Sequence, residues 1–388
     1  MHELRPLEGM SVLDLSQGIA GPHCGGLLAE YGARVVKIEP PGGDWMRPLG
    51  PGYGDRSAAF IYYNRGKESL ALDLKAEGAC EVVLNFAAKC DVLIENNRPG
   101  VSERLGFGYD VVRARNPKIV YVSVSGLGQT GPDATKPLSD TVAQAHSGMM
   151  MINRGRADVP AKIDTTIVDA ITGLYAFQCA TMALWGNSET RVARHLDISL
   201  AQAAAAIQGP KILEYGIIDG MPVKLNPPAG SYRTADGWLA LTLVREADWQ
   251  AICRVIDRPD LASDPKFDSF TARASNIVEL TAILDDIIVG ATTADWVERL
   301  SAEGVLASQI NDYGQWLAHR QTRGTDAAPV IPVASPGEGP VARTPGLSSQ
   351  ARLSPVLGEH SRALLEEAGL SHENIEQLIA GGAAVAPE

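Results

Sequence analysis

The chain has 388 residues, of which 45% are hydrophobic and 21% are charged. This composition is typical of a soluble globular protein with a large core, and the length favours two or three domains over one. The formal net charge of −12 disfavours nucleic acid and anionic membrane as partners, but it is compatible with a local basic pocket that binds a phosphorylated small molecule.

The first half of the chain alternates short runs rich in β-branched residues with helical patterns. Residues 11–15 are predicted to form a strand, followed by a loop and by a helix in which Pro22 takes the first position and Gly32 marks the end. The same patterns predict strands at 35–39, 70–74, 92–95 and 119–125, and a helix at 76–89. Such alternation indicates a parallel sheet covered by helices on both faces.

Asp169 is the single charged residue between Ile167 and Asn187, and it stands at the start of a long apolar helical pattern. Desolvating a carboxylate without a partner is costly, so such a residue is usually either a helix cap bonded to backbone N–H groups or a reactive group. Because Asp is a favoured N-cap residue, the spacing alone favours the cap.

The second half contains a change of composition that indicates a domain boundary. After a predicted strand at 195–200 and an Ala-rich helix at 201–215, the segment 221–230 holds three prolines. A hairpin over 232–244 that turns at Asp236 and Gly237, and then amphipathic helices up to about residue 324, are predicted to form a second module.

The last part of the chain combines an irregular stretch with short helices. Residues 328–345 are rich in proline and glycine and are expected to be an irregular return segment. Helices are predicted at 361–368 and 373–379.

Neither a disulfide framework nor a metal site is indicated by the cysteines and histidines. The five cysteines form no CxxC pair, and the seven histidines form no HExxH motif or Cys/His cluster.

The N-terminal segment lacks an export signal, and the longest apolar stretch, near 170–185, is interrupted by Thr172, Gln178 and Thr181. We therefore expect a cytoplasmic protein without a membrane-spanning helix.

The first strand, loop, helix and strand imitate the start of a dinucleotide-binding domain. Glu39 lies roughly 20 residues after Gly18, Gly21 and Gly25, where such domains carry an acid that binds a ribose. The glycine spacing departs from GxGxxG, however, and Pro22 occupies the tightest part of the turn. A loop that packs on the sheet is therefore favoured over an NAD site.

A second candidate site follows the predicted strand 92–95. Asn96 and Arg98 come directly after this strand, Arg104 lies about one helical turn further on, and Lys75 follows another strand. Ligands of open α/β sheets bind at the carboxyl ends of strands, and one Arg guanidinium can bind two phosphate oxygens at once. The alternative is that these cations are solvated or paired with nearby glutamates.

Six motifs, in this order along the chain, resemble those of the family III CoA-transferases, also called the CaiB/BaiF family. They are VLDLSQGIAGPHCGGLLAEYGARVVKIEPPGGD, YYNRGKESLALDLK, DVLIENNRPGVSERLGFGY, VYVSVSGLGQTGP, SGMM and VDAITGLYAF. The similarity continues into SPVLGEHSRALLEEAGL near the end, so it spans nearly the whole chain. The set is highly specific for the family and far less specific for the substrate.

The resemblance implies an α/β fold, a division into domains and a partner. A Rossmann-like large domain with a parallel sheet is expected to consist of residues 1–220, which bind CoA, and of the return segment 326–388. A smaller α+β domain, residues 221–325, is expected between them. The resemblance also implies a homodimer of two interlocked chains.

The resemblance further implies roles for individual residues, with Asp169 matching the nucleophilic aspartate of the family. The CoA site is expected to include Leu72 and Leu74 beside the adenine, Lys75, Asn96, Arg98 and Arg104. The substrate pocket is expected to include Gln17, Ile19, Ser139 and a loop of Ala229, Gly230, Ser231 and Tyr232 that closes over the acyl group. No metal or tightly bound cofactor is implied, because coenzyme A enters as the acyl-CoA substrate.

An aspartate needs no activating base in this chemistry, because its unperturbed pKa of about 3.9 leaves it ionised at neutral pH. The Asp169 carboxylate is expected to attack an acyl-CoA thioester, giving a mixed anhydride and CoA thiolate. The thiolate then forms an aspartyl-CoA thioester, which the acceptor carboxylate attacks in turn. Backbone N–H groups at the start of the helix after Asp169, or near Ala229 and Gly230, are expected to stabilise the oxyanions.

Two other functions are compatible with the same fold. In an acyl-CoA racemase or epimerase, Asp169 would be one of two acid/base groups, but such relatives carry a Gly-His-Asp triplet where this chain has Leu138, Ser139 and Asp140. His146 is better explained as a packed histidine than as a substitute for the missing imidazole. A CoA-binding or assembly protein without turnover is the third alternative.

The substrate is less well defined than the reaction. Formyl-CoA:oxalate relatives carry a Gln and a Tyr where this chain has Ile19 and Ser139, which disfavours oxalate. We expect succinyl-CoA as donor and a small organic acid as acceptor, because this combination is common in the family. Arg233 or Arg245 would be available to bind a second carboxylate, although a surface role is the simpler explanation for each.

Overall fold

The computed structural model describes residues 4–155, 158–185, 192–221, 226–348 and 352–387. These residues divide into two compact units. The first consists of Met1–Ile212 and Asp326–Glu388, and the second of Leu213–Thr325. The division lies close to the expected boundaries at 220 and 325, and residues 222–225 of the predicted boundary segment lie outside the described residues.

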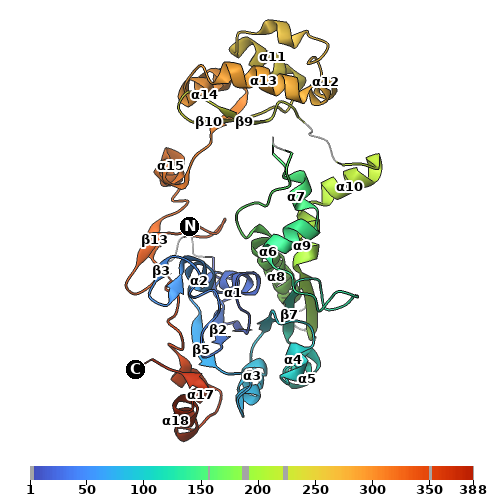
Figure 1. Ribbon diagram of the computed structural model, residues 1–388. Helices are drawn as coiled ribbons and strands as arrows, with labels where there is room; N and C mark the ends of the chain where they lie inside the picture. The colour runs from blue at the N-terminus through green and yellow to red at the C-terminus, as the bar shows by residue number, and fades with distance from the viewer. Residues whose placement is uncertain (1–3, 156–157, 186–191, 222–225, 349–351, 388) are drawn as a thin grey trace. The chain divides into compact units, whose positions relative to one another are not determined.

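The first unit is built on a seven-stranded sheet whose strand order is β14-β5-β2-β1-β6-β7-β8 (Figure 1). The strands are β1 (Ser11–Asp14), β2 (Arg34–Glu39), β5 (Glu68–Leu72), β6 (Val92–Glu95), β7 (Val120–Ser125), β8 (Arg194–Ser199) and β14 (Ala384–Val385). All neighbours pair in parallel except β14, which is antiparallel to β5. Without β14 this is the strand order of the Rossmann fold, and the order reverses between β1 and β6.

Alternating side chains of the strands feed two hydrophobic clusters, one on each face of the sheet. Val12 of β1 belongs to one cluster, and its neighbour Leu13 belongs to the other. Helices α3 (Ala79–Ala87), α5 (Tyr109–Arg115), α17 (Ser361–Glu367) and α18 (His372–Ala380) contribute to the Leu13 cluster. Helices α1 (Ala20–Glu30), α6 (Asp140–His146), α8 (Ile167–Trp185) and α9 (Leu200–Ile207) contribute to the Val12 cluster. The predicted parallel sheet with helices on both faces is therefore confirmed.

Besides shifts of a few residues in element bounds, such as β5 at Glu68–Leu72 instead of 70–74, three local predictions differ from the structure. Helix α1 begins at Ala20, so Pro22 is its third residue rather than its first. The helix predicted at 201–215 is two helices, α9 and α10 (Gly209–Ile218). The break coincides with Pro210, which lacks a backbone N–H and disfavours helical geometry in the residue before it.

The return segment is the third difference, because it is more regular than predicted. Its two short strands, β12 (Val330–Pro332) and β13 (Glu338–Pro340), pair antiparallel. The segment is held on the first unit by polar contacts, among them Arg56, which donates to the carbonyl oxygen of Ser354 at 2.9 Å. Helices α17 and α18 and strand β14 then complete the sheet and one of its covering layers.

The second unit is a small α+β domain. Strands β9 (Gly230–Arg233), β10 (Trp238–Thr242) and β11 (Leu306–Gln309) form an antiparallel sheet in the order β11-β10-β9. The predicted hairpin turns as expected, since Thr234 donates its N–H to the carbonyl oxygen of Gly237 at 3.0 Å. Helices α11 (Glu246–Val255), α13 (Ile277–Ile288) and α14 (Thr293–Ala302) supply most of the core around Trp249.

Helix α8 meets the length and composition of a membrane span, and among the described residues it is the one helix that does. Its polar residues therefore do not interrupt the apolar stretch enough to rule out a span, contrary to the prediction. The same helix supplies Val168, Ala176, Ala180 and Leu184 to the core beside α1, as a core helix of a soluble protein does. That the protein does not enter a membrane stays a prediction.

Two lysines are fully buried among acids at the carboxyl ends of β1 and β2. Lys67 donates to Asp14, to the side chain of Asn64 and to the carbonyl oxygen of Pro22, each at 2.8 Å. Lys37 forms an ion pair of 3.0 Å with Asp44 and donates to the carbonyl oxygen of Ser16 at 2.6 Å. Burial raises the pKa of Asp14, but the two lysines together lower it by more, so the pKa lies below its usual value.

Removing one of these lysines is expected to destabilise the protein strongly. Lys67→Met leaves Asp14 buried without its direct partner, so we expect a loss of about 3–5 kcal/mol in the free energy of unfolding. Urea unfolding followed by circular dichroism measures the effect. Arg115→Met, which removes an exposed ion pair with Glu81, is the control and should change little. Equal small effects in both variants would contradict a structural role for the buried pair.

Candidate active site

The loop after β1 and the residues after β6 are joined at the point where the strand order reverses, which is where ligands of such sheets bind. The backbone N–H of Gln17 donates to Oδ1 of Asn96 at 2.9 Å, and Nδ2 of Asn96 donates to the carbonyl oxygen of Gln17 at 2.7 Å. The side-chain amide of Asn96 is therefore engaged in holding this loop. The predicted contact of Asn96 with CoA remains a prediction.

Gly18 shows why the loop after β1 needs a glycine. Its φ is +80°, and an added Cβ would lie 2.4 Å from the ring of Trp45. Its N–H donates to both oxygens of Asp44, at 3.0 and 3.1 Å. Ile19 follows it, but its side chain is buried and packs with Met46 and Phe60. The side chain of Ile19 therefore points into the core, and only its backbone is left to line a substrate pocket as predicted.

Glu39 does not match the ribose-binding acid of a dinucleotide site. It is fully buried, and its carboxylate accepts hydrogen bonds from Arg47 at 2.7 Å and from Ser69 at 2.8 Å. Burial raises the pKa of Glu39, but Arg47 and Lys37 lower it, and the net shift is downward. A carboxylate with this many internal partners has no free oxygen to offer a ribose. This agrees with the favoured interpretation, in which the loop packs on the sheet and does not bind NAD.

Three exposed cations follow the carboxyl ends of β5 and β6: Lys75, Arg98 and Arg104. Among the described residues, none of the three forms an ion pair. Glu95 does not pair with them, because it is buried and accepts hydrogen bonds from Asn97 and Ser102 at 2.9 and 3.1 Å. The predicted cations are thus available to phosphates. Of the two leucines predicted beside the adenine, Leu72 is buried in the core and Leu74 is partly exposed.

Asp169 is the third residue of α8 and not its N-cap, so the cap interpretation is wrong. No hydrogen bond to its carboxylate is found in the described part of the chain. Burial, and next the nearby Asp140, raise the pKa of Asp169 to about 7. The assumption of an ordinary aspartate pKa was therefore also wrong, and the residue is poised to gain or lose a proton near neutral pH.

Asp140 supplies the cap that Asp169 does not. Its Oδ2 accepts the backbone N–H groups of Val168 at 2.7 Å and of Asp169 at 3.1 Å. The N–H groups of Ile167 and Ala170 donate to the carbonyl oxygens of Thr165 and Thr166. All four N–H groups at the start of α8 are thus engaged, and the expectation that this helix start stabilises the oxyanion is not supported.

His23 and Tyr63 complete the surroundings of Asp169. Nδ1 of His23 lies 2.9 Å from the carbonyl oxygen of Ala170, which only accepts, so this nitrogen carries the proton. Burial lowers the pKa of His23 and raises that of Tyr63, whose hydroxyl is hydrogen-bonded to Thr166. Helices α1 and α8 meet closely here, since a Cβ on Gly173 would lie 2.6 Å from that of His23. Neutral groups therefore line this side of the carboxylate.

The remaining predicted residues lie in both units. Ser139 is exposed at the N-cap position of α6, directly before Asp140. In the second unit, Tyr232 is buried and donates its hydroxyl to the carbonyl oxygen of Pro228 at 2.6 Å, whereas Gly230 and Ser231 are exposed and Ala229 is partly exposed. Arg245 pairs with Asp248 at 3.0 Å, and Arg233 is exposed.

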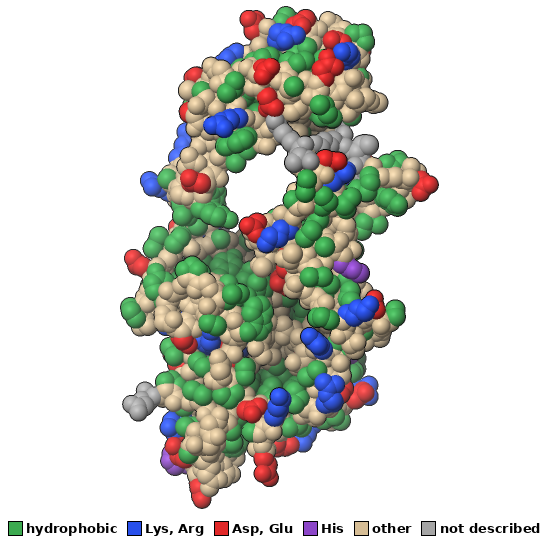
Figure 2. Space-filling view, viewed as in Figure 1, with side chains coloured by type: hydrophobic (Ala, Val, Ile, Leu, Met, Phe, Trp, Pro, Cys, Tyr) green, Lys and Arg blue, Asp and Glu red, His purple; other side chains and the backbone are tan. Residues whose placement is uncertain are grey.

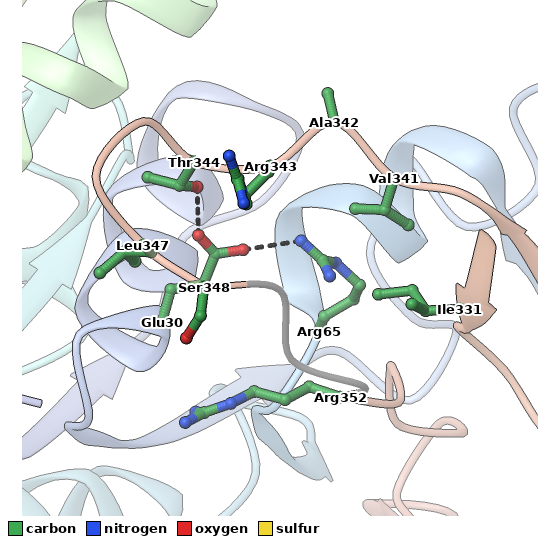
Figure 3. Close-up of a pocket in the computed structure, with 10 residues that line it drawn as sticks. All are labelled: Glu30, Arg65, Ile331, Val341, Ala342, Arg343, Thr344, Leu347, Ser348 and Arg352. Atoms are coloured by element: carbon green, nitrogen blue, oxygen red, sulfur yellow. Dashed lines mark hydrogen bonds and ion pairs between the residues drawn. The ribbon is translucent and has the colours of Figure 1, made fainter. Parts of the chain in front are cut away.

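A pocket elsewhere in the first unit holds none of the predicted site residues. Figure 3 shows Glu30 reaching Arg65, at 2.7 Å, and Thr344 across this pocket. The pocket lies between α1, the end of α2 (Ala58–Asn64) and the return segment. Because Glu30 already neutralises the buried Arg65, we interpret these contacts as an attachment of the return segment.

Residues 7–361 match the family model described as "CoA-transferase family III". The chain belongs to this family. It is 34% identical to acetyl-CoA:oxalate CoA-transferase of Acetobacter aceti over 80% of this chain and 82% of that protein. It is 30% identical to human succinyl-CoA:glutarate CoA-transferase, covering 95% of this chain and 87% of the other.

A solved structure supports the fold of this family III CoA-transferase. A CaiB/BaiF family protein from Brucella suis superposes with a TM-score of 0.83 at 29% identity, over 94% of this chain and 100% of that one. The α/β fold and the reaction class expected from the sequence are therefore confirmed. The relatives reported are named as transferases, so the racemase alternative is not favoured.

The protonation of Asp169 is predicted to change near neutral pH. Carbodiimides react with protonated carboxyl groups, so labelling of Asp169 should fall as pH rises, with a midpoint near 7. Peptide mass spectrometry after labelling between pH 5 and 9 measures this midpoint. Asp164, which is exposed and paired with Lys162, has a lowered pKa and should show a midpoint far below that of Asp169. A midpoint for Asp169 near 4 would contradict this account.

Proposed function

We propose that this CoA-transferase moves CoA from an acyl-CoA donor to a small carboxylic acid through an aspartyl-CoA thioester on Asp169. The observation that carries the proposal is a part-buried carboxylate with a raised pKa and without a hydrogen-bond partner among the described residues. Burying a carboxylate without a partner costs folding free energy, and groups with such perturbed pKa values cluster at functional sites. Its helix contacts α1, which begins directly after the loop at the reversal of strand order.

The steps conserve atoms and charge without a redox partner. The Asp169 carboxylate adds to the thioester carbonyl, and collapse of the adduct breaks the C–S bond to give a mixed anhydride and CoA thiolate. The thiolate attacks the aspartyl carbonyl and expels the donor acid as a carboxylate. The acceptor carboxylate then attacks the aspartyl-CoA thioester, and its C–S bond breaks to give a second mixed anhydride and CoA thiolate. The thiolate finally attacks the acceptor's carbonyl in this anhydride, which forms the new acyl-CoA and releases the Asp169 carboxylate.

CoA recognition is assigned to the three exposed cations. Lys75, Arg98 and Arg104 follow strand ends of the sheet and have no ion-pair partner within the described ranges. Guanidinium groups bind phosphate oxygens bidentately, whereas an ammonium acts as a point charge. This local basic group would offset the acidic net charge of −12 where the CoA phosphates bind.

The donor is proposed to be succinyl-CoA and the acceptor a small organic acid. Supporting this choice, relatives named for succinyl-CoA include the human enzyme and succinyl-CoA:D-citramalate CoA-transferase of Chloroflexus aurantiacus, which is 31% identical over 96% of this chain. The residues at Ile19 and Ser139 disfavour oxalate, yet the Acetobacter aceti relative is named for oxalate. Acetyl-CoA with oxalate is therefore a necessary arm of any substrate test.

A cytoplasmic location is part of the proposal. All five cysteines, Cys24, Cys80, Cys90, Cys179 and Cys253, are free thiols. Free thiols are stable in a reducing compartment, and burial raises the pKa of Cys24 and so protects it as a thiol.

Asp169→Ala is expected to abolish transfer. The purified protein is incubated with succinyl-CoA or acetyl-CoA and a panel of free acids, including glutarate, malate and oxalate, and new acyl-CoA masses are recorded. We expect the variant to lose at least about 1,000-fold in rate, because no other carboxylate takes over covalent catalysis. Asp164→Asn, at an exposed position, is the control. Transfer by Asp169→Ala at the native rate would refute the nucleophile.

The protein is expected to be a homodimer. Helix α10 has no buried residue, although five of its ten residues are large and apolar: Ile212, Leu213, Tyr215, Ile217 and Ile218 (Figure 2). An apolar helix left open in one chain is typical of an interface. Light scattering should therefore give twice the chain mass of 41.2 kDa.

The double variant Leu213→Glu/Ile217→Glu tests this surface, because these side chains are 65% and 73% exposed. We expect it to weaken the dimer, whereas Val111→Glu on α5 should leave the mass unchanged. A native protein that runs as a monomer would contradict the interlocked dimer.

A further inference from the structure

Asp140 is held by three neutral hydrogen-bond donors. Two are the N–H groups of Val168 and Asp169, which share its Oδ2. The third is Nε2 of Gln144, which reaches its Oδ1 at 2.6 Å. Gln144 is fully buried and is itself fixed, because its Oε1 accepts the N–H of Ile163 at 2.8 Å. The carboxylate of Asp140 thus joins α6 to the start of α8.

The two neighbouring carboxyl groups are in opposite environments. Asp140 accepts hydrogen bonds from three neutral donors. The carboxylate of Asp169 has none among the described residues.

Within the described ranges, the other groups around the pair do not supply a compensating cation. Tyr63 on α2 and His23 on α1 face this region and are neutral near pH 7, since burial raises the pKa of the first and lowers that of the second. Lys162 is exposed and is paired with Asp164 at 2.8 Å. An exposed, paired charge is screened by water and salt, so Asp140 remains the strongest charge acting on Asp169.

We propose that Asp140 is a positioning residue for the transfer reaction: its carboxylate fixes the backbone that carries Asp169 and places a negative charge beside the nucleophile. The inference rests on the proposed role of Asp169. A more basic carboxylate is a better nucleophile towards a thioester, and its cost is that a larger share of the enzyme is protonated below neutral pH. A helix cap alone would need the hydrogen bonds of Asp140 but not its charge.

Asp140→Asn removes the charge and keeps the cap, because an Asn oxygen can accept the same two N–H groups, whereas its Nδ2 cannot accept from Gln144 as Oδ1 of Asp140 does. We expect the carbodiimide-labelling midpoint of Asp169 to fall by about one pH unit or more. The acid limb of kcat/KM should shift with it, while kcat at pH 8 should drop several-fold because the nucleophile is less basic. Labelling requires no turnover, so this readout stands even if transfer activity is absent.

Two further variants complete the test. Asp140→Glu keeps the charge and should hold the midpoint near 7 even if its altered reach lowers the melting temperature. Asp164→Asn, the matched exposed control, should also leave the midpoint unchanged. If Asp140→Asn keeps the native midpoint, or if Asp140→Glu lowers it equally, the charge has no role and the proposal is overturned. Failure of the proposed function is recognised separately, by native transfer rates in Asp169→Ala.

Discussion

The buried ion pairs of Lys37 and Lys67 are the constraint on which the carboxyl edge of the sheet depends. Each lysine donates hydrogen bonds to the backbone as well as pairing with an acid: Lys37 donates to the carbonyl oxygen of Ser16, and Lys67 donates to that of Pro22. Burying these charges is expensive, and partners on every side are what make it tolerable. As a result, hydrogen bonds from two buried charged groups fix the backbone of the loop after β1.

That loop connects the separate parts of the site. Its Gln17 is locked to Asn96 after β6, and it leads directly into α1, whose His23 reaches the backbone next to Asp169. A continuous set of contacts therefore links the buried ion pairs to the helix that carries the nucleophile. Asp140 of α6 completes this set of contacts at the start of α8, so that the position of Asp169 depends on α1, α6 and the loop after β1.

The sequence predicts the sheet well and the site unevenly, for a physical reason. The strand at 92–95 is defined by a local apolar run and its bounds were correct, whereas the strand predicted at 70–74 lies at Glu68–Leu72. The isolation of Asp169 is also visible in the sequence, but its raised pKa and the identity of its cap depend on Asp140, which is distant in the chain. Ile19 and Tyr232 could be assigned from the resemblance to the family, yet no local pattern reveals that their side chains are buried.

The most direct test of the central claim is to look for CoA bound covalently to Asp169. The protein is mixed with succinyl-CoA without an acceptor, quenched in acid, digested and analysed by peptide mass spectrometry. The account predicts a CoA thioester on the peptide that contains Asp169, which disappears when an acceptor acid is added and is converted to the hydroxamate by hydroxylamine. A CoA adduct on another residue, or transfer to the acceptor with no adduct at Asp169 during turnover, would contradict it.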